Sequence, residues 1–88
     1  MEPYSLSFKK GVEKDLRKIP KEIDLHIFDH VENLVNEPVP HDAYKLASAE
    51  NLYRIRVGDY RVIFQVLHQS REVNVISIRH RGIAYRGL

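Results

Sequence analysis

Arg54, Arg56 and Arg61 are the residues of this sequence whose type and spacing most suggest chemistry. The guanidinium group of arginine presents a planar fork of donors that matches the oxygens of phosphate or carboxylate. If Gly58-Asp59 is a two-residue turn between two strands, Arg56 lies directly opposite Arg61. Like charges in that position cost an antiparallel strand pair stability. We therefore favour an anion-binding site here over a solvated face on which the arginines splay apart.

The stretch from Leu52 to Leu67 supplies the hairpin that positions these arginines. It is rich in β-branched and aromatic residues, and its central Gly-Asp pair suits a tight turn because glycine accepts positive φ. Side chains alternate across a strand, so the predicted register places Arg54, Arg56 and Arg61 on one face. The other face collects the apolar side chains of Tyr53, Ile55, Val57, Tyr60, Val62 and Phe64.

Basic and aromatic residues gather again after the last predicted strand, at His80, Arg81 and Tyr85. Simple alternation through that strand places Val73, Val75, Ser77, Arg79 and Arg81 on one side and Ile76, Ile78 and His80 on the other. The sequence does not say which side continues the face of the hairpin arginines. An aromatic ring beside arginines is a common way to hold single-stranded nucleic acid, so Tyr85 either has that role or packs on the core.

Charge is divided unevenly along the 88 residues. Residues 1–50 contain seven Lys and Arg and ten Asp and Glu, a net charge of −3. Residues 51–88 contain seven arginines against Asp59 and Glu72, a net charge of +5, and no lysine. This basic half predicts nucleic acid or an acidic protein as the partner.

The composition also argues against several classes of function. The sequence has no cysteine, so disulfides and thiolate metal sites are excluded. It has no Gly-rich phosphate loop, no nucleophile elbow and no paired carboxylates in the basic half. The first residues do not look like a secretion signal, and no apolar run approaches the ~18 residues of a membrane span. We expect a soluble, cytoplasmic protein with no membrane partner.

Hydrophobic periodicity predicts the elements that precede the hairpin. Alternation predicts a short first strand at residues 4–8, and apolar spacings of three and four predict helices over Lys9–Lys18 and from Pro20 to Glu37. Residues 39–51 are expected to be a connector, in which Tyr44, Lys45 and Leu46 form at most a short turn.

After the hairpin, residues 73–78 read as the third strand of a meander. The predicted fold class is therefore α+β in one domain, residues 1–88. It consists of an N-terminal strand, a helical hairpin and then a three-stranded antiparallel meander, with the helices packed on one face of the sheet.

With these elements in place, the sequence resembles the RelE/ParE toxin superfamily and, within it, the RelE-like mRNA interferase branch. The resemblance covers nearly the whole chain and is most specific in Tyr53-Arg54-Ile55-Arg56-Val57-Gly58-Asp59-Tyr60-Arg61, followed later by His80, Arg81 and Tyr85. It implies a type II toxin that cuts messenger RNA in the ribosomal A site as an endoribonuclease, with no metal and no cofactor. It also implies a cognate antitoxin, with a toxin that is a monomer when free and heteromeric with the antitoxin.

The resemblance also implies roles for single residues. Arg54, Arg56 and Arg61 match basic residues of the RelE branch around the turn, and Arg81 and Tyr85 match residues near its C-terminus. Nuclease members often have lysines in place of the first two arginines, and a lysine with a lowered pKa can accept the proton of the attacking 2′-hydroxyl. Arginine stays protonated and cannot easily do so.

Two residues are then candidates for the general base, His80 and Tyr85. The missing lysines also leave an alternative open. The ParE branch shares the fold but inhibits DNA gyrase by binding, without catalysis.

Overall fold

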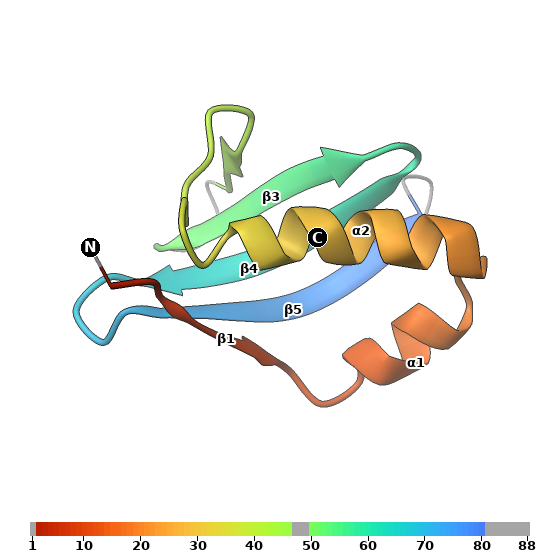
Figure 1. The fold of residues 1–88 in the computed structure, drawn as a ribbon, viewed down its shortest axis with the longest axis horizontal. Helices are drawn as coiled ribbons and strands as arrows, with labels where there is room; N and C mark the ends of the chain where they lie inside the picture. The colour runs from red at the N-terminus through yellow and green to blue at the C-terminus, as the bar shows by residue number, and fades with distance from the viewer. Residues whose placement is uncertain (1, 47–49, 81–88) are drawn as a thin grey trace.

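The computed structural model describes residues 2–46 and 50–80. In chain order its elements are β1 (Ser5–Phe8), α1 (Val12–Arg17), α2 (Lys21–Asn33), β2 (Tyr44–Lys45), β3 (Leu52–Val57), β4 (Tyr60–Leu67) and β5 (Glu72–His80). The strands form one sheet in the order β1-β5-β4-β3-β2. Helix α2 runs across one face of this sheet, and α1 lies beside the far end of β5 (Figure 1). The α+β class and the three-stranded meander are confirmed.

The hairpin of β3 and β4 has the predicted register. Val57 pairs with Tyr60, and Arg56 pairs with Arg61. Gly58, the first residue of the turn, has a φ of 60°, a conformation that glycine adopts without steric cost. The apolar face of the hairpin is buried against the helices, with Val62 and Phe64 fully enclosed at its centre.

A β-bulge interrupts the pairing of β4 with β5. Ile63 pairs with Ser77, but the next residue, Phe64, pairs with Val75, so Ile76 is the extra residue. A bulge places two residues of one strand opposite one residue of its partner and shifts the phase of alternation.

The bulge corrects the alternation expected for the last strand. Val73 and Val75 are buried before it, and Ile78 is buried after it. The side chains of β5 that face the core are therefore odd-numbered before the bulge and even-numbered after it. Arg79 lies on the face opposite Val73, whereas simple alternation places the two residues on one side.

Helix α2 carries the predicted apolar stripe into the core. Ile27, Val31 and Leu34 are buried, whereas Leu25, which lies off the stripe, is 64% exposed. The helix ends at Asn33 and not at Glu37. The backbone N–H groups of residues 34–36 donate to carbonyls three positions earlier, which tightens the last turn and closes the helix sooner.

Helix α1 is shorter than predicted. It begins at Val12 and not at Lys9, because Gly11 has a φ of 112° and this left-handed conformation interrupts the backbone before the helix. The side chain of Val12 is buried in the same core cluster as Ile27 of α2. Both helices therefore contribute to one core on one face of the sheet, as predicted.

The expected turn at Tyr44 is a strand. Tyr44 pairs with Arg54, and Lys45 pairs with Tyr53, so β2 extends the sheet beyond β3. A strand of two residues is too short to show a period in the sequence, which is why the pattern predicts only a turn. The sheet consequently has five strands and not four.

Helix α1 also completes the edge of β5. Strand β1 runs parallel to β5 and pairs only with its first half, residues 72–75. Beyond that point, a carboxylate oxygen of Asp15 accepts a hydrogen bond from the backbone N–H of Ile78, with the two atoms 3.2 Å apart. A side chain of α1 thus takes the place of a neighbouring strand.

Candidate nucleic-acid interface

Arginines from three neighbouring strands form a line on the face of the sheet opposite the helices. Arg56 of β3 pairs with Arg61 of β4, and Arg61 pairs with Arg79 of β5. Directly opposed residues point to the same side of a sheet, and neighbouring strands lie about 4.8 Å apart. We call Arg56, Arg61 and Arg79 the arginine row.

The centre of the arginine row is the most enclosed part of it. Arg61 is 9% exposed, whereas Arg56 and Arg79 are exposed on either side. The Nε of Arg56 donates a hydrogen bond to the carbonyl oxygen of Gly58 at 3.1 Å, which bends this side chain toward the turn. A charge in partly buried surroundings attracts an opposite charge more strongly than it would in bulk water. The row therefore suits an anion with several oxygens, such as a phosphodiester.

Arg54 and Tyr44 extend the same face toward the edge of the sheet. Arg54 lies two residues before Arg56 on β3 and pairs with Tyr44 of β2. The guanidinium carbon of Arg54 lies over the Tyr44 ring, 4.8 Å from its centroid. Tyr44 is 62% exposed, an unusual degree for an aromatic side chain. We call the face of the sheet that carries Arg54 and the arginine row the arginine face; an accessible aromatic ring borders it.

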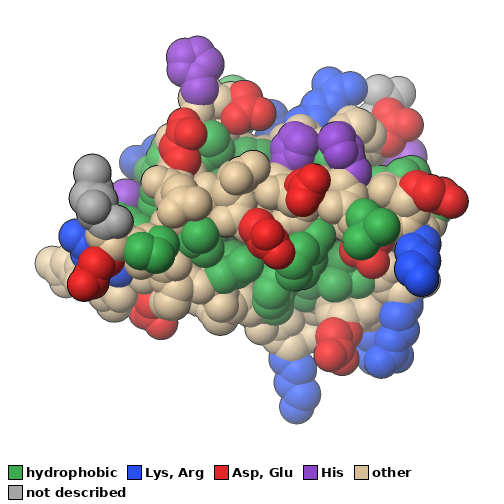
Figure 2. All heavy atoms as spheres, in the orientation of Figure 1, with side chains coloured by type: hydrophobic (Ala, Val, Ile, Leu, Met, Phe, Trp, Pro, Cys, Tyr) green, Lys and Arg blue, Asp and Glu red, His purple; other side chains and the backbone are tan. Residues whose placement is uncertain are grey.

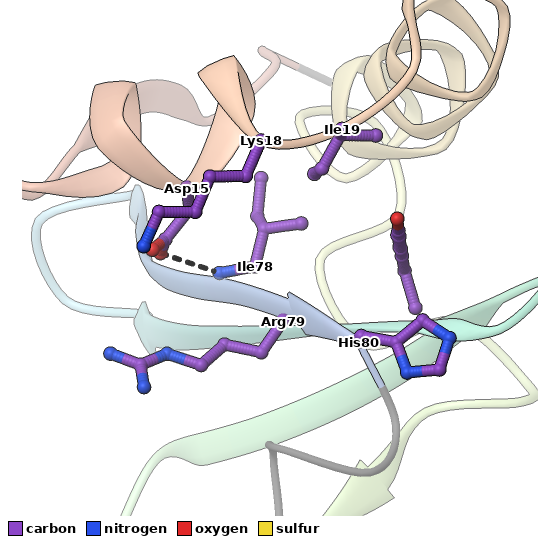
Figure 3. Close-up of a pocket in the computed structure, with 7 residues that line it drawn as sticks. Asp15, Lys18, Ile19, Ile78, Arg79 and His80 are labelled. Carbon is purple, nitrogen blue, oxygen red and sulfur yellow. Dashed lines mark hydrogen bonds between the residues drawn. The ribbon is translucent and has the colours of Figure 1, made fainter.

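His80 lies on the other side of the sheet. It pairs with Tyr60, and the two rings meet edge to face with their centroids 5.4 Å apart. Two cavities, of about 220 and 510 Å³, include both residues in their walls. In Figure 3, which shows the smaller cavity, Asp15 reaches the backbone of Ile78 from α1.

The predicted site residues are thus only partly brought together. Arg54, Arg56 and Arg61 share one face, whereas His80 points to the opposite face, where the helices pack. Its role in proton transfer stays a prediction. Arg81 and Tyr85 lie outside the described residues, and their roles stay predictions as well.

Sequence reasoning misses two residues of this surface, Arg79 and Tyr44. The bulge hides Arg79, because simple alternation cannot tell which side of β5 meets the arginines of β4. Tyr44 is hidden by the shortness of β2. Two residues are too few to show the alternation of a strand, so no local signal in the sequence marks Tyr44.

The opposite surface, over α2, has a different character. Ile23, Leu25 and Phe28 are exposed there, among the acidic residues of the same helix. Figure 2, seen from this side, shows hydrophobic and acidic side chains interspersed along the helix, with Lys and Arg mainly toward the margins. Basic character is therefore not spread evenly over the molecule.

Neither a membrane span nor a cluster of metal ligands occurs in residues 2–46 and 50–80. The helices there are too short and too polar to cross a bilayer. No three His, Asp or Glu side chains of these residues come together as metal ligands.

Comparison with known proteins agrees with this fold. A family model described as the ParE toxin of the type II toxin-antitoxin system parDE matches residues 6–85. Toxin RelE of Mycobacterium tuberculosis is 28% identical over 85 residues, which cover 96% of this chain and 88% of that protein.

Two archaeal structures resemble the chain over nearly its whole length. In the RelE-RelB complex from Pyrococcus horikoshii OT3, the matched chain has 33% identity and a TM-score of 0.81, with coverage of 91% of this chain and 97% of that chain. In the RelB-RelE antitoxin-toxin complex from Methanococcus jannaschii, the matched chain has 28% identity and a TM-score of 0.75, with coverage of 92% of this chain and 96% of that chain. The chain therefore belongs to the ParE toxin family of type II toxin-antitoxin systems, within the RelE/ParE toxin superfamily.

Proposed function

We propose that this toxin is an endoribonuclease that cleaves messenger RNA in the ribosomal A site, in the cytoplasm and without a metal ion. The arginine row is the observation that carries the proposal. A phosphodiester gains negative charge as a nucleophile attacks it, and preorganised cations stabilise that charge more than they stabilise the ground state. RNA supplies both the phosphate and a neighbouring 2′-hydroxyl that can act as the nucleophile.

In the proposed reaction, the 2′-hydroxyl oxygen attacks the adjacent phosphorus while the bond to the 5′-oxygen of the next nucleotide breaks. A cyclic phosphate and a free 5′-hydroxyl result. Arg54, Arg56 and Arg61 stabilise the charge that accumulates on the phosphate oxygens. Their planar forks of donors match two oxygens at once.

Proton transfer requires residues beyond these arginines. The 2′-hydroxyl must lose a proton and the leaving oxygen must gain one, yet guanidinium groups do not give up their protons near neutral pH. His80 and Tyr85 are the proposed candidates for the base, and Arg81 or His80 is proposed to assist the leaving oxygen. Because His80 lies on the helix side of the sheet, away from the arginine row, we favour Tyr85 as the base and Arg81 at the leaving oxygen.

We also propose that a cognate antitoxin binds the free toxin, which is otherwise a monomer. Support comes from the two archaeal relatives, whose structures are complexes of RelE with RelB. The net charge of +5 in residues 51–88 predicts that the partner is acidic where it meets the arginine face. Complex formation should then weaken as salt increases, and an affinity independent of salt would contradict this contribution.

A second candidate function is inhibition of DNA gyrase without catalysis. Two observations favour it: the matching family model is described as a ParE toxin, and arginines occupy the positions where a nuclease often has lysines. In that case the arginine face would be a docking surface for a protein.

One pair of assays tests both candidates. Purified toxin is added to ribosomes programmed with a defined messenger RNA, and in parallel to gyrase with supercoiled DNA. We expect cuts in the RNA at the A-site codon and no trapped DNA breaks. DNA breaks without RNA cleavage would replace the first candidate with the second.

A further inference from the structure

The Tyr44 ring lies against the Arg54 guanidinium at the edge of the arginine face, and Tyr44 itself has no part in the proposed reaction. Tyr44 is opposite Arg54 in the pairing of β2 with β3, so both side chains leave the sheet on the side of the arginine row. The 4.8 Å separation between the guanidinium carbon and the ring centroid is that of a cation–π contact. The contact fixes the position of an aromatic ring that is otherwise on the surface.

The exposure of Tyr44 needs an explanation. At 62% exposed, the ring contributes little to the core, and it does not belong to the core cluster or to the residues packed against it. Phe8 and Phe28, which are also partly exposed, stack on each other on the helix side with their ring centroids 6.2 Å apart. Tyr44 instead has a charged neighbour that is itself part of the arginine face. Its ring is therefore held in place and accessible at the same time.

The position of Tyr44 relative to the arginine row suits single-stranded nucleic acid. From the strand spacing and the rise per residue, its Cα lies about 12 Å from that of Arg61, two strands across and two residues along the sheet. A chain whose phosphate sits at Arg61 would pass Tyr44 with a nearby base. Aromatic side chains beside arginines bind unpaired bases by stacking, with little dependence on sequence.

We propose that the Tyr44 ring, held by its contact with Arg54, is a stacking site for an unpaired base of the bound messenger RNA. Tyr44 itself does not touch the cleaved phosphate. This inference rests on the proposed nuclease function and adds a second point of contact with the same substrate. Stacking on Tyr44 contributes to binding in the ground state and not to the chemical step. Its loss therefore changes the concentration at which the toxin saturates, and leaves the rate at saturation nearly unchanged.

The test compares Tyr44→Val, Tyr44→Phe and the wild type in single-turnover cleavage on programmed ribosomes. Valine keeps strand propensity at the edge, and phenylalanine keeps the ring. We expect Tyr44→Val to raise the half-saturating toxin concentration by about 5- to 150-fold, the range for losing one stacked base, with Tyr44→Phe close to wild type. Phe28→Leu, which removes a partly exposed ring from the helix side, is the control and should have no effect.

Messenger RNAs with a single abasic nucleotide separate stacking from indirect effects. The abasic nucleotide is placed in turn at each position near the cleaved bond. At one of these positions the missing base is the one that stacks on Tyr44, so that RNA should bind wild-type toxin and Tyr44→Val equally. If Tyr44→Val weakens binding by the same factor with every RNA, Tyr44 only positions Arg54 or touches the ribosome, and the proposal is overturned. An unchanged half-saturating concentration with Tyr44→Val overturns it as well.

The two proposals fail in different ways. If the wild type does not cut RNA at all, the proposed nuclease function is wrong, and the proposed stacking site is then wrong as well. If the wild type cuts RNA and Tyr44→Val behaves like the wild type, the stacking site alone is wrong.

Discussion

The two faces of the central sheet come from the same strands but contribute to the molecule in opposite ways. On the helix side, Val62, Phe64 and Val66 of β4 are fully buried. Burial of such side chains stabilises the fold by about 1.5–3 kcal/mol each. On the other side, Arg61 has an arginine directly opposite it on both neighbouring strands, and each such pair costs about 0.2–1 kcal/mol. The helix side can thus offset a face that is unfavourable for folding, as expected if that face binds an anion.

The largest expected effect tests the stabilising face. Phe64→Ala removes a fully buried ring and should lower the free energy of unfolding by about 3–5 kcal/mol. Gln65→Ala changes the next residue, whose side chain points to the other face and makes only a 3.5 Å hydrogen bond to Asn74. It should cost about 1 kcal/mol or less. Chemical denaturation of both variants gives the comparison, and equal losses would mean that the two faces do not differ as described.

The next effect tests the arginine face. Arg61→Gln removes the central guanidinium of the row and should slow RNA cleavage by about 10²–10³-fold, the usual effect of losing one donor to the transition state. Arg17→Gln, the same substitution on α1 at a residue that forms only an exposed ion pair, is the control and should cut RNA normally. Single-turnover rates at saturating toxin measure both. If the two variants lose the same cleavage rate, the activity depends on the net charge of the protein and not on the position of Arg61 in the row.

A smaller effect is expected for His80, because the structure places it on the helix side with Tyr60. We expect His80→Gln to slow cleavage by less than about 10-fold. Loss of a general acid or base typically costs about 10²–10⁴-fold. A loss of that size, with normal binding to the ribosome, would establish His80 as the proton shuttle and would require its side chain to reach the other face of the sheet.

The smallest effect concerns the repulsion within the row. Arg79→Thr removes one of two like-charge pairs with Arg61 and keeps strand propensity, so it should stabilise the free protein by about 0.2–1 kcal/mol. The gain should shrink at high salt, which screens exposed charges over about 10 Å at 0.1 M. Thermal unfolding at low and high salt measures it. A destabilised variant would show that Arg79 supports the fold instead of straining it.

The sequence predicts the hairpin well because three signals agree there: β-branched residues, a Gly-Asp turn and strict alternation. The same signals place Arg56 opposite Arg61, and the structure confirms this pair. Local sequence does not show how β5 meets β4. The bulge at Ile76 results from packing between distant parts of the fold, because it keeps both Val75 and Ile78 in the core. It also determines the side of the sheet on which Arg79 lies.

The sequence also predicts only part of the candidate site. Residues on the hairpin can be grouped by sequence because one turn fixes their register. The positions of Tyr44 and His80 depend on strand pairings outside this hairpin, whose registers no local pattern encodes. Helix ends also depend on backbone details, such as the left-handed Gly11 before α1, and these shift the boundaries without changing the fold.

The contact between Asp15 and the backbone of Ile78 bears on how toxin molecules meet one another. An open strand edge is a template on which a second copy can add its own strand, the first step toward self-association. Here the N–H of Ile78 is already engaged by the side chain of α1, so a second chain would have to displace that helix before pairing. This part of β5 is thereby protected against edge-to-edge aggregation. The arginine face of the same sheet is positively charged, so it repels another copy and attracts a polyanion.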